Sequence, residues 1–196
     1  MSSLSPPIDR ENIESDAALI RRVTAGDPLA CRQLVDAHLR RVVGLAYRML
    51  GDMAAAEDVA QESFLRLWRQ APRWQAKARI ATWLYRVAHN QCIDLLRGRK
   101  TVAEDDAPEI IDPDADPAMD HQSRQVAAAV NAAMARLPER QRTAITLVHH
   151  NEVTNIEAAA IMGISVDALE SLLARGRRRL KELLEDRKGD LMGEER

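Results

Sequence analysis

A helix-turn-helix pattern at residues 155–181 constrains the fold of this chain more than any other feature. Ala159 is small enough for two helices to pack closely, and Gly163 supplies the positive φ of a tight turn. Ser165 can cap the second helix through its hydroxyl group. The second helix then has one apolar face to bury, formed by Val166, Leu169, Leu172, Leu173 and Leu180.

The same helix ends in a cluster of positive charge. Residues 175–181 contain no acidic side chain and five basic ones, namely Arg175, Arg177, Arg178, Arg179 and Lys181. A helix that enters the major groove of DNA and ends beside phosphates would carry such cations. A buried helical hairpin with a solvated basic end is the alternative that this pattern leaves open.

The composition favours helices and argues against a membrane or secreted protein. Aromatic residues make up 3% of the 196 residues, and alanine, leucine and arginine dominate, so an all-α fold is predicted. No run approaches the ~20 apolar residues of a membrane span, and the first residues lack the apolar core of a signal peptide. Cys31 and Cys92 have no paired spacing and are predicted to be reduced thiols. We therefore expect a cytoplasmic protein with no membrane insertion.

An acidic segment that contains prolines divides the chain. Residues 99–123 have a net charge of −6 and include Pro108, Pro113 and Pro117. Like charges and prolines keep a segment extended and solvated, so we expect a flexible acidic linker that lets two small helical domains vary their spacing. A long surface loop within one domain is the alternative. The predicted parts are a disordered tail at 1–14, a domain at 15–100, the linker at 101–118, a second domain at 119–186 and a tail at 187–196.

Caps, turns and apolar spacing predict the helices of each domain. Ser15 or Asp16 is expected to cap the first helix, and Gly98 is expected to close the fourth. The first domain should contain helices at about 15–26, 28–50, 53–70 and 80–97, and the second at about 119–136 and 138–150 before the helix-turn-helix. The predicted core stripes are Leu34, Leu39, Val42 and Ala46; Val59, Ala60, Phe64 and Leu67; and Leu84, Val87, Ala88 and Leu95.

The sequence contains no recognisable catalytic motif. It has no glycine-rich phosphate loop and no HExxH motif. His149 and His150 are adjacent, so on a helix they point ~100° apart and cannot share a metal ion. We therefore predict no catalytic residues, no metal site, no cofactor and no enzymatic activity.

Two other segments have the composition of binding surfaces. In the third expected helix, Asp58 and Gln61 form a polar face that Leu65 and Trp68 extend, which suits docking of another protein's helix. The alternative is a solvated face whose acidic residues interact favourably with the helix dipole. Residues 73–100 alternate basic side chains with tryptophan and tyrosine, and this pattern suits stacking on unpaired bases. The aromatic residues of this segment can equally belong to the core.

Taken in order, these motifs resemble the extracytoplasmic-function sigma factors, which are compact bacterial transcription initiation subunits of the sigma-70 family. The resemblance covers residues 15–186. The matching segments read AEDVAQESF at 56–64, TWLYRVAHN at 82–90, LPERQR at 137–142, GISV at 163–166 and RGRRRL at 175–180.

The resemblance implies three binding surfaces, with core RNA polymerase and promoter DNA as partners. Asp58 and Gln61, with Leu65 and Trp68 beside them, would bind polymerase. The minus-ten element would be bound and melted by Trp83, Arg86, Asn90, Arg97, Arg99 and Lys100. The minus-thirty-five element would be read by Ser165, Asp167, Glu170, Ser171, Arg175, Arg178 and Arg179. The resemblance also implies a response to stress or another signal, under the control of an anti-sigma factor.

Glu170 departs from the family pattern, because many members carry lysine or arginine at this position. A carboxylate can accept a hydrogen bond from cytosine N4, but it repels phosphate, so an unusual promoter preference is expected. A conventional helix-turn-helix repressor or activator is the first alternative function, although it would need neither the Asp58–Gln61 face nor the aromatic-basic segment. A helical protein-interaction adaptor is the second alternative, and the arginine cluster counts against it.

Overall fold

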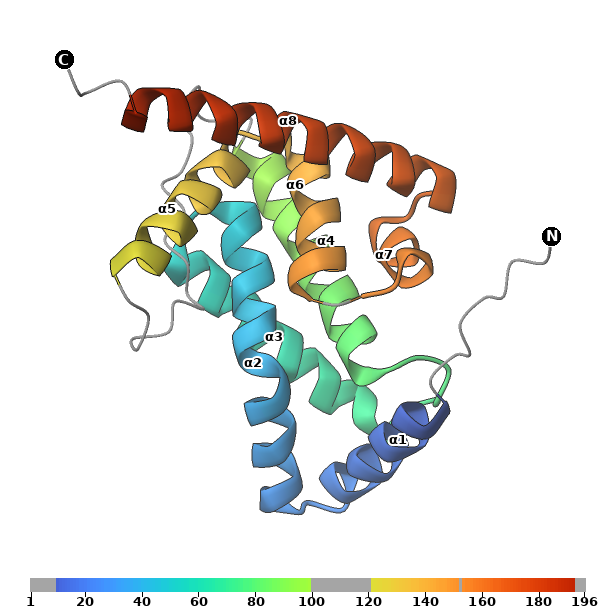
Figure 1. Cartoon of the computed structure of the whole chain (residues 1–196). Helices are drawn as coiled ribbons and strands as arrows, with labels where there is room; N and C mark the ends of the chain where they lie inside the picture. Colours follow the sequence, from blue (N-terminus) through green and yellow to red (C-terminus); the bar gives the residue numbers. More distant parts are fainter. Residues whose placement is uncertain (1–9, 100–120, 152, 193–196) are drawn as a thin grey trace.

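The structure, a computed structural model, describes residues 10–99, 121–151 and 153–192. The first domain is formed by α1 (Arg10–Thr24), α2 (Pro28–Leu50), α3 (Met53–Gln70), the short 3-10 helix η1 (Ala71–Arg73) and α4 (Ile80–Arg99). Helices α2, α3 and α4 pack around a shared core, and α1 lies across the lower end of α2 (Figure 1). The described residues contain no β-strand, so the all-α prediction is confirmed for them.

Capping residues explain where α2 and α3 begin. The Asp27 carboxylate accepts from the backbone N–H groups of Leu29 at 2.9 Å and Ala30 at 3.3 Å, and Pro28 occupies the first turn. Gly51 ends α2 with a φ of 70°, and Asp52 then caps α3 by accepting from the N–H of Ala55. These local signals account for the agreement between the predicted and observed bounds of both helices.

The second domain is formed by α5 (His121–Ala135), α6 (Glu139–Ile145), the π-helical turn η2 (Thr146–His150), α7 (Asn155–Met162) and α8 (Val166–Met192). Thr154 and Glu157 form a reciprocal capping box at the start of α7, and Gly163 ends that helix with a φ of 64°. The Ser165 hydroxyl accepts from the N–H of Ala168, so its predicted role as a cap is confirmed. The long helix α8 lies across α5, α6 and α7 (Figure 1).

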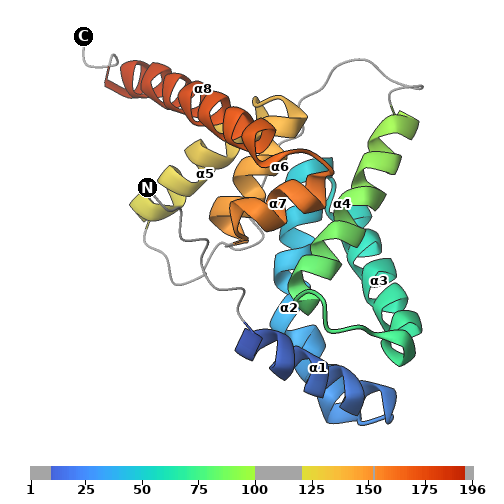
Figure 2. The same ribbon diagram turned by 90° about the vertical axis from the view of Figure 1, so that its right-hand side faces the viewer.

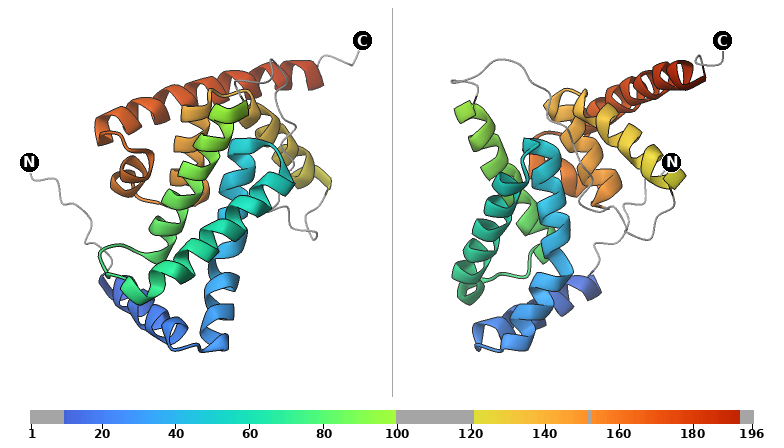
Figure 3. Two further views of the ribbon diagram at one scale, coloured as in Figure 1. Left: turned by 180° about the vertical axis from the view of Figure 1, so that it is seen from behind. Right: turned by 90° about the vertical axis from the view of Figure 1, so that its left-hand side faces the viewer.

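Hydrogen bonds between described residues join the two domains. Thr82 of α4 donates to the Glu157 carboxylate at 2.7 Å. Arg142 donates to the backbone oxygen of Met49 at 3.3 Å, near the negative end of the α2 dipole. Asn151 donates to the backbone oxygen of Arg41, also at 3.3 Å. The domains are therefore in contact in this structure, with α6 and α7 against α2 and α4 (Figure 2 and Figure 3).

Several predicted boundaries were wrong. Helix α1 begins at Arg10, inside the predicted disordered tail, and α8 extends to Met192, inside the predicted C-terminal tail. Asp16 lies within α1, where its carboxylate accepts from the N–H of Ile80, so it caps α4 instead of its own helix. Helix α4 continues through Gly98 to Arg99, since one glycine costs a helix only ~1 kcal/mol. The predicted linker lies outside the described residues.

Most residues of the predicted core stripes are buried, whereas Val87 is half-buried and two leucines are exposed. Leu34, Phe64 and Leu84 are buried, as expected. Leu39 and Leu95, by contrast, are 40% and 42% exposed. Apolar periodicity identifies the inward side of a helix, but it does not reveal which turns a neighbouring helix covers.

Candidate nucleic-acid interface

Helix α3 presents the first candidate surface. Asp58, Gln61, Leu65 and Trp68 are spaced three or four residues apart, so they lie on one face of the helix. The two polar side chains are exposed, Leu65 is half-buried, and Trp68 is 37% exposed. The ring of Trp68 rests against buried Phe64, with 6.2 Å between the ring centroids. The structure therefore brings all four predicted polymerase-binding residues together on one face, with an indole held at its edge.

Helix α4 presents the second surface. Trp83, Arg86, Asn90 and Arg97 recur at helical spacing and form a stripe along one side of the helix. Trp83 is half-buried, while the other three side chains are exposed. Trp83 packs edge-on against Trp74, with 6.0 Å between the ring centroids, so part of the indole belongs to the domain structure. The side chain of Arg99 and the whole of Lys100 lie outside the described residues.

A cavity of about 740 Å³ borders this stripe where the domains meet. Asn90 and Arg97 line it from α4, and Glu139 and Arg140 line it from α6. His89 also lines it, and burial lowers the pKa of this histidine below its ordinary value. The imidazole is therefore kept neutral beside Asn90, among the charged side chains that also line the cavity.

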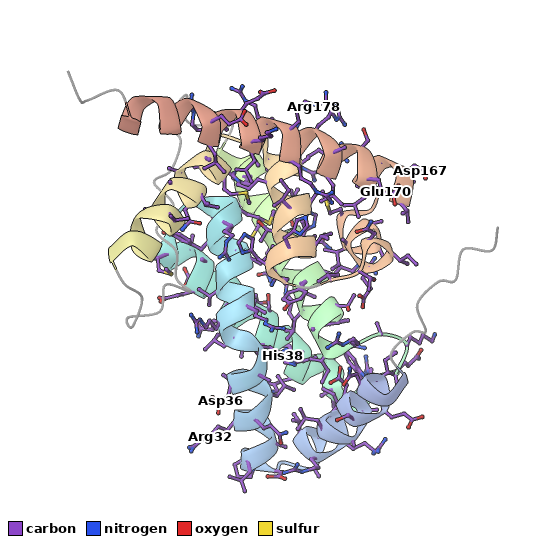
Figure 4. The ribbon with its side chains drawn as sticks, in the orientation of Figure 1. Arg32, Asp36, His38, Asp167, Glu170 and Arg178 are labelled. Carbon is purple, nitrogen blue, oxygen red and sulfur yellow. The ribbon has the colours of Figure 1, made fainter. Side chains whose placement is uncertain are left out.

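Helix α8 presents the third surface. Leu169, Leu172 and Leu173 are buried against the second domain, which leaves the opposite side of the helix exposed. The exposed residues include Ser165 before the helix and Asp167, Glu170, Ser171, Arg175, Arg178 and Arg179 within it. Figure 4 shows Asp167 and Glu170 at the start of α8 and Arg178 further along it. The exposed side of α8 thus begins with acidic side chains and becomes basic towards its C-terminal part.

The arginines of α8 have different surroundings. Arg179 pairs with Glu182 at 3.1 Å, so a nearby acid partly neutralises this cation. Arg175 donates to the backbone oxygen of Ser171 at 3.2 Å. The close spacing of the arginines spreads them around the helix, so they cannot all face one partner.

The residues that hold these helices in position were not predicted from the sequence. Arg142 is buried and donates to Ala135 within its own domain as well as to Met49 across the domain contact. Burial lowers the pKa of Arg142 below its usual value. Gly176 is buried where α8 approaches α6. The Thr154–Glu157 spacing is a recognised helix-start signal and could have identified the beginning of α7.

The described residues lack two other kinds of site. They contain no cluster of three or more histidine, cysteine, aspartate or glutamate side chains able to hold a metal ion. Within the same ranges, no helix is long and apolar enough to cross a membrane. Cys31 and Cys92 are free thiols, and burial raises the pKa of Cys92 to about 12, so this thiol stays protonated.

The two helical domains that carry these surfaces both match sigma-70 families. Residues 34–102 match the family Sigma-70 region 2, and residues 127–180 match Sigma-70, region 4. Among curated proteins, the chain is 31% identical over 178 residues to the ECF RNA polymerase sigma factor SigW of Bacillus subtilis, covering 85% of this chain and 95% of SigW. The chain belongs to the ECF RNA polymerase sigma factors, and neither matching family is an enzyme family.

Solved structures share the fold. CnrH, solved in complex with the cytosolic domain of CnrY, is similar with a TM-score of 0.65 and 24% identity over 87% of this chain and 97% of that one. The sigma factor RpoE of Bartonella quintana, solved in complex with the anti-sigma factor NepR, is similar with a TM-score of 0.64 and 24% identity, covering 79% and 96% of the two chains. Both similarities extend over both helical domains.

Proposed function

We propose that this sigma factor binds core RNA polymerase through the face of α3 formed by Asp58, Gln61, Leu65 and Trp68. The observation that carries the proposal is the combination of exposed polar groups and a half-exposed indole on one side of a single helix. Aromatic side chains at the centre of a docking face contribute most of the affinity of many interfaces, and polar neighbours fix the orientation. A repressor that acts without polymerase has no use for such a face.

The stripe on α4 would then meet the minus-ten element. Asn90 offers an amide that can donate to and accept from the edge of a flipped base, and Trp83 offers a ring on which a base can stack. Arg86 and Arg97, which are exposed beside them, would neutralise backbone phosphates. Arg99 and Lys100 extend the same basic segment in the sequence.

The exposed side of α8 would read the minus-thirty-five element. The residues from Ser165 to Ser171 lie in the first turns, where recognition helices meet base edges. Glu170 can accept from cytosine N4, whereas Arg175 and Arg178 are better suited to phosphates. The acidic start of the helix should therefore determine sequence preference, and its basic continuation should supply affinity.

The regulation of this protein follows from its family and from its neighbours. Among the similar structures, CnrH is bound to the cytosolic domain of CnrY, and the sigma factor RpoE is bound to the anti-sigma factor NepR. We propose that this chain is likewise controlled by an anti-sigma factor that covers its binding surfaces until a signal releases it. The chain would act in the cytoplasm together with polymerase, with no catalytic activity of its own.

Binding to core polymerase tests the proposal. Replacing Asp58 and Gln61 with alanine should weaken binding by ~1–3 kcal/mol for each hot-spot residue, because the docking face loses its polar contacts. Gln70→Ala is the matched control, since this exposed glutamine ends the same helix on a different side. The measurement is a fluorescence titration of the labelled chain with core polymerase. Equal affinity of the double variant and the wild type would remove this face from the interface.

A further inference from the structure

The first turn of α4 lacks a capping residue in its own sequence. The backbone oxygen of Arg79 accepts from the N–H of Trp83 at 3.1 Å, so Arg79 is the N-cap residue of this helix. An arginine has no side-chain acceptor, and neither of the two preceding residues, Lys77 and Ala78, supplies one. The free N–H groups at this helix start therefore need a partner from elsewhere in the chain.

That partner is Asp16 of α1. Its carboxylate accepts from the N–H of Ile80 at 2.7 Å, although the two residues are 64 positions apart. Ile80 is completely buried, so water cannot replace the carboxylate without a local opening. The negative charge also interacts favourably with the positive end of the α4 dipole.

Helix α1 is itself anchored in the first domain. Ile20 and Val23, on α1, are buried in the hydrophobic core. The same helix contacts η1, so α1 contacts the elements on both sides of the loop at 74–79 (Figure 1). Trp74 and Trp83 bridge this loop through their ring contact. The loop and the first turn of α4 are therefore fixed against one helix.

One titratable side chain of α2 lies within electrostatic reach of the Asp16 carboxylate. His38 of α2 lies close enough for Asp16, Arg41 and Arg79 to influence its titration, and burial lowers the pKa of this histidine. Figure 4 shows His38 near the middle of α2.

We propose that Asp16 is a positioning residue for promoter melting. By capping α4 from α1, it sets the orientation of the first turn and hence of the Trp83 indole, which lies three residues after Ile80. Asp16 does not itself touch DNA in this proposal. The inference rests on the proposed function of Trp83 and Asn90 in the minus-ten interface.

The first experiment measures the contact without DNA or polymerase. Asp16→Ala should accelerate amide hydrogen exchange in residues 80–83 by about tenfold, because the Ile80 N–H loses its acceptor. Asp16→Asn keeps an oxygen that can accept this hydrogen bond, so most of the protection should return. Asp27→Ala is the matched control, since it removes a side-chain cap from α2 and should leave residues 80–83 unchanged. Unchanged exchange in Asp16→Ala would overturn the inference.

The second experiment measures promoter opening by the holoenzyme. The templates are a promoter selected with the wild-type holoenzyme from randomised DNA and the same promoter with a pre-melted bubble. Asp16→Ala should reduce opening of the duplex by on the order of fivefold, the usual size of a lost cap, with polymerase affinity unchanged. Asp16→Asn should recover most of the loss, and the bubble template should recover part of it. An equal loss on both templates, or an equal loss in Asp27→Ala, would contradict a positioning role.

Two further variants separate failure of this inference from failure of the proposed function. Trp83→Ala and Asn90→Ala should each reduce opening of the duplex more than they reduce closed-complex binding. If neither does so, the proposed minus-ten interface is wrong. If both do so and Asp16→Ala opens the promoter normally, the interface stands and the positioning role of Asp16 is wrong.

Discussion

Gly176 controls how closely α8 approaches α6, and adding a single methyl group there tests this packing. A Cβ atom at Gly176 would lie 2.8 Å from Cδ1 of Ile145 and 3.3 Å from Cβ of Gln141. Both distances are shorter than ordinary van der Waals contact, and Ile145 is itself buried. Gly176→Ala must therefore displace α6 or force Ile145 into another rotamer.

Two opposing effects set the size of the change. Overpacking a core typically costs ~1–3 kcal/mol, whereas replacing glycine with alanine inside a helix gains ~1 kcal/mol. We expect a net loss of about 1 kcal/mol in the free energy of unfolding. Ile145→Val removes the Cδ1 atom that clashes and alone costs ~0.5–1.5 kcal/mol. The double variant should therefore be more stable than the sum of the single changes predicts, by about 1 kcal/mol.

Urea unfolding followed by circular dichroism measures these free energies. Gly98→Ala is the control, because a Cβ at this position of α4 meets no atom within 4 Å and should be neutral or slightly stabilising. If Gly176→Ala is as benign as the control, or if its effect adds to that of Ile145→Val, the close approach of α8 to α6 does not limit stability.

Three further predictions concern recognition, pH and domain contact. Glu170→Lys should change the minus-thirty-five sequences that are selected from random DNA, and an unchanged selection would exclude Glu170 from base reading. Arg178→Ala should only weaken binding to all sequences equally, and it should reduce by ~1 the slope of log binding constant against log salt concentration. Burial lowers the pKa of His89, so this histidine becomes protonated at a higher pH in the unfolded chain than in the folded one. The free energy of unfolding should therefore fall as the pH drops below the ordinary histidine pKa of 6.5. The fall should be smaller in His89→Gln. Equal pH dependence of the two proteins would exclude this contribution. Thr82→Val removes the hydrogen bond to Glu157 and should weaken the contact between the domains by about 1 kcal/mol. X-ray scattering should then give a larger radius of gyration. An unchanged radius would show that this bond does not hold the domains together.

Much of the fold could be predicted because its signals are local. Pro28 and Gly51 mark the ends of α2, and Gly163 and Ser165 form the turn between α7 and α8. Each acts through its own backbone geometry or a hydrogen bond to a nearby residue, so it can be read from the sequence. The exposure of Asp58 and Gln61 follows from the same helical spacing.

The contacts between distant parts of the chain could not be predicted. Asp16 resembles a cap for its own helix, because the sequence does not reveal that the buried N–H of Ile80 lies beside it. Arg142 and Asn151 likewise bond to backbone oxygens of the first domain, and no local pattern encodes those partners. Tertiary packing determines which residues form such hydrogen-bonded pairs. It also determines which end of an apolar stripe is covered by a neighbouring helix. The functional roles of the site residues stay predictions for the same reason, since they depend on a partner.

Promoter-dependent transcription by reconstituted polymerase tests the central claim most directly. Core polymerase without a sigma factor would be mixed with this chain and a library of genomic fragments, and the starts of the transcripts would be sequenced. We expect a limited set of start sites that share upstream elements, and we expect the Asp58→Ala, Gln61→Ala double variant to lose them. Transcription that begins at the same scattered positions with and without the chain would contradict the claim that it directs polymerase to promoters.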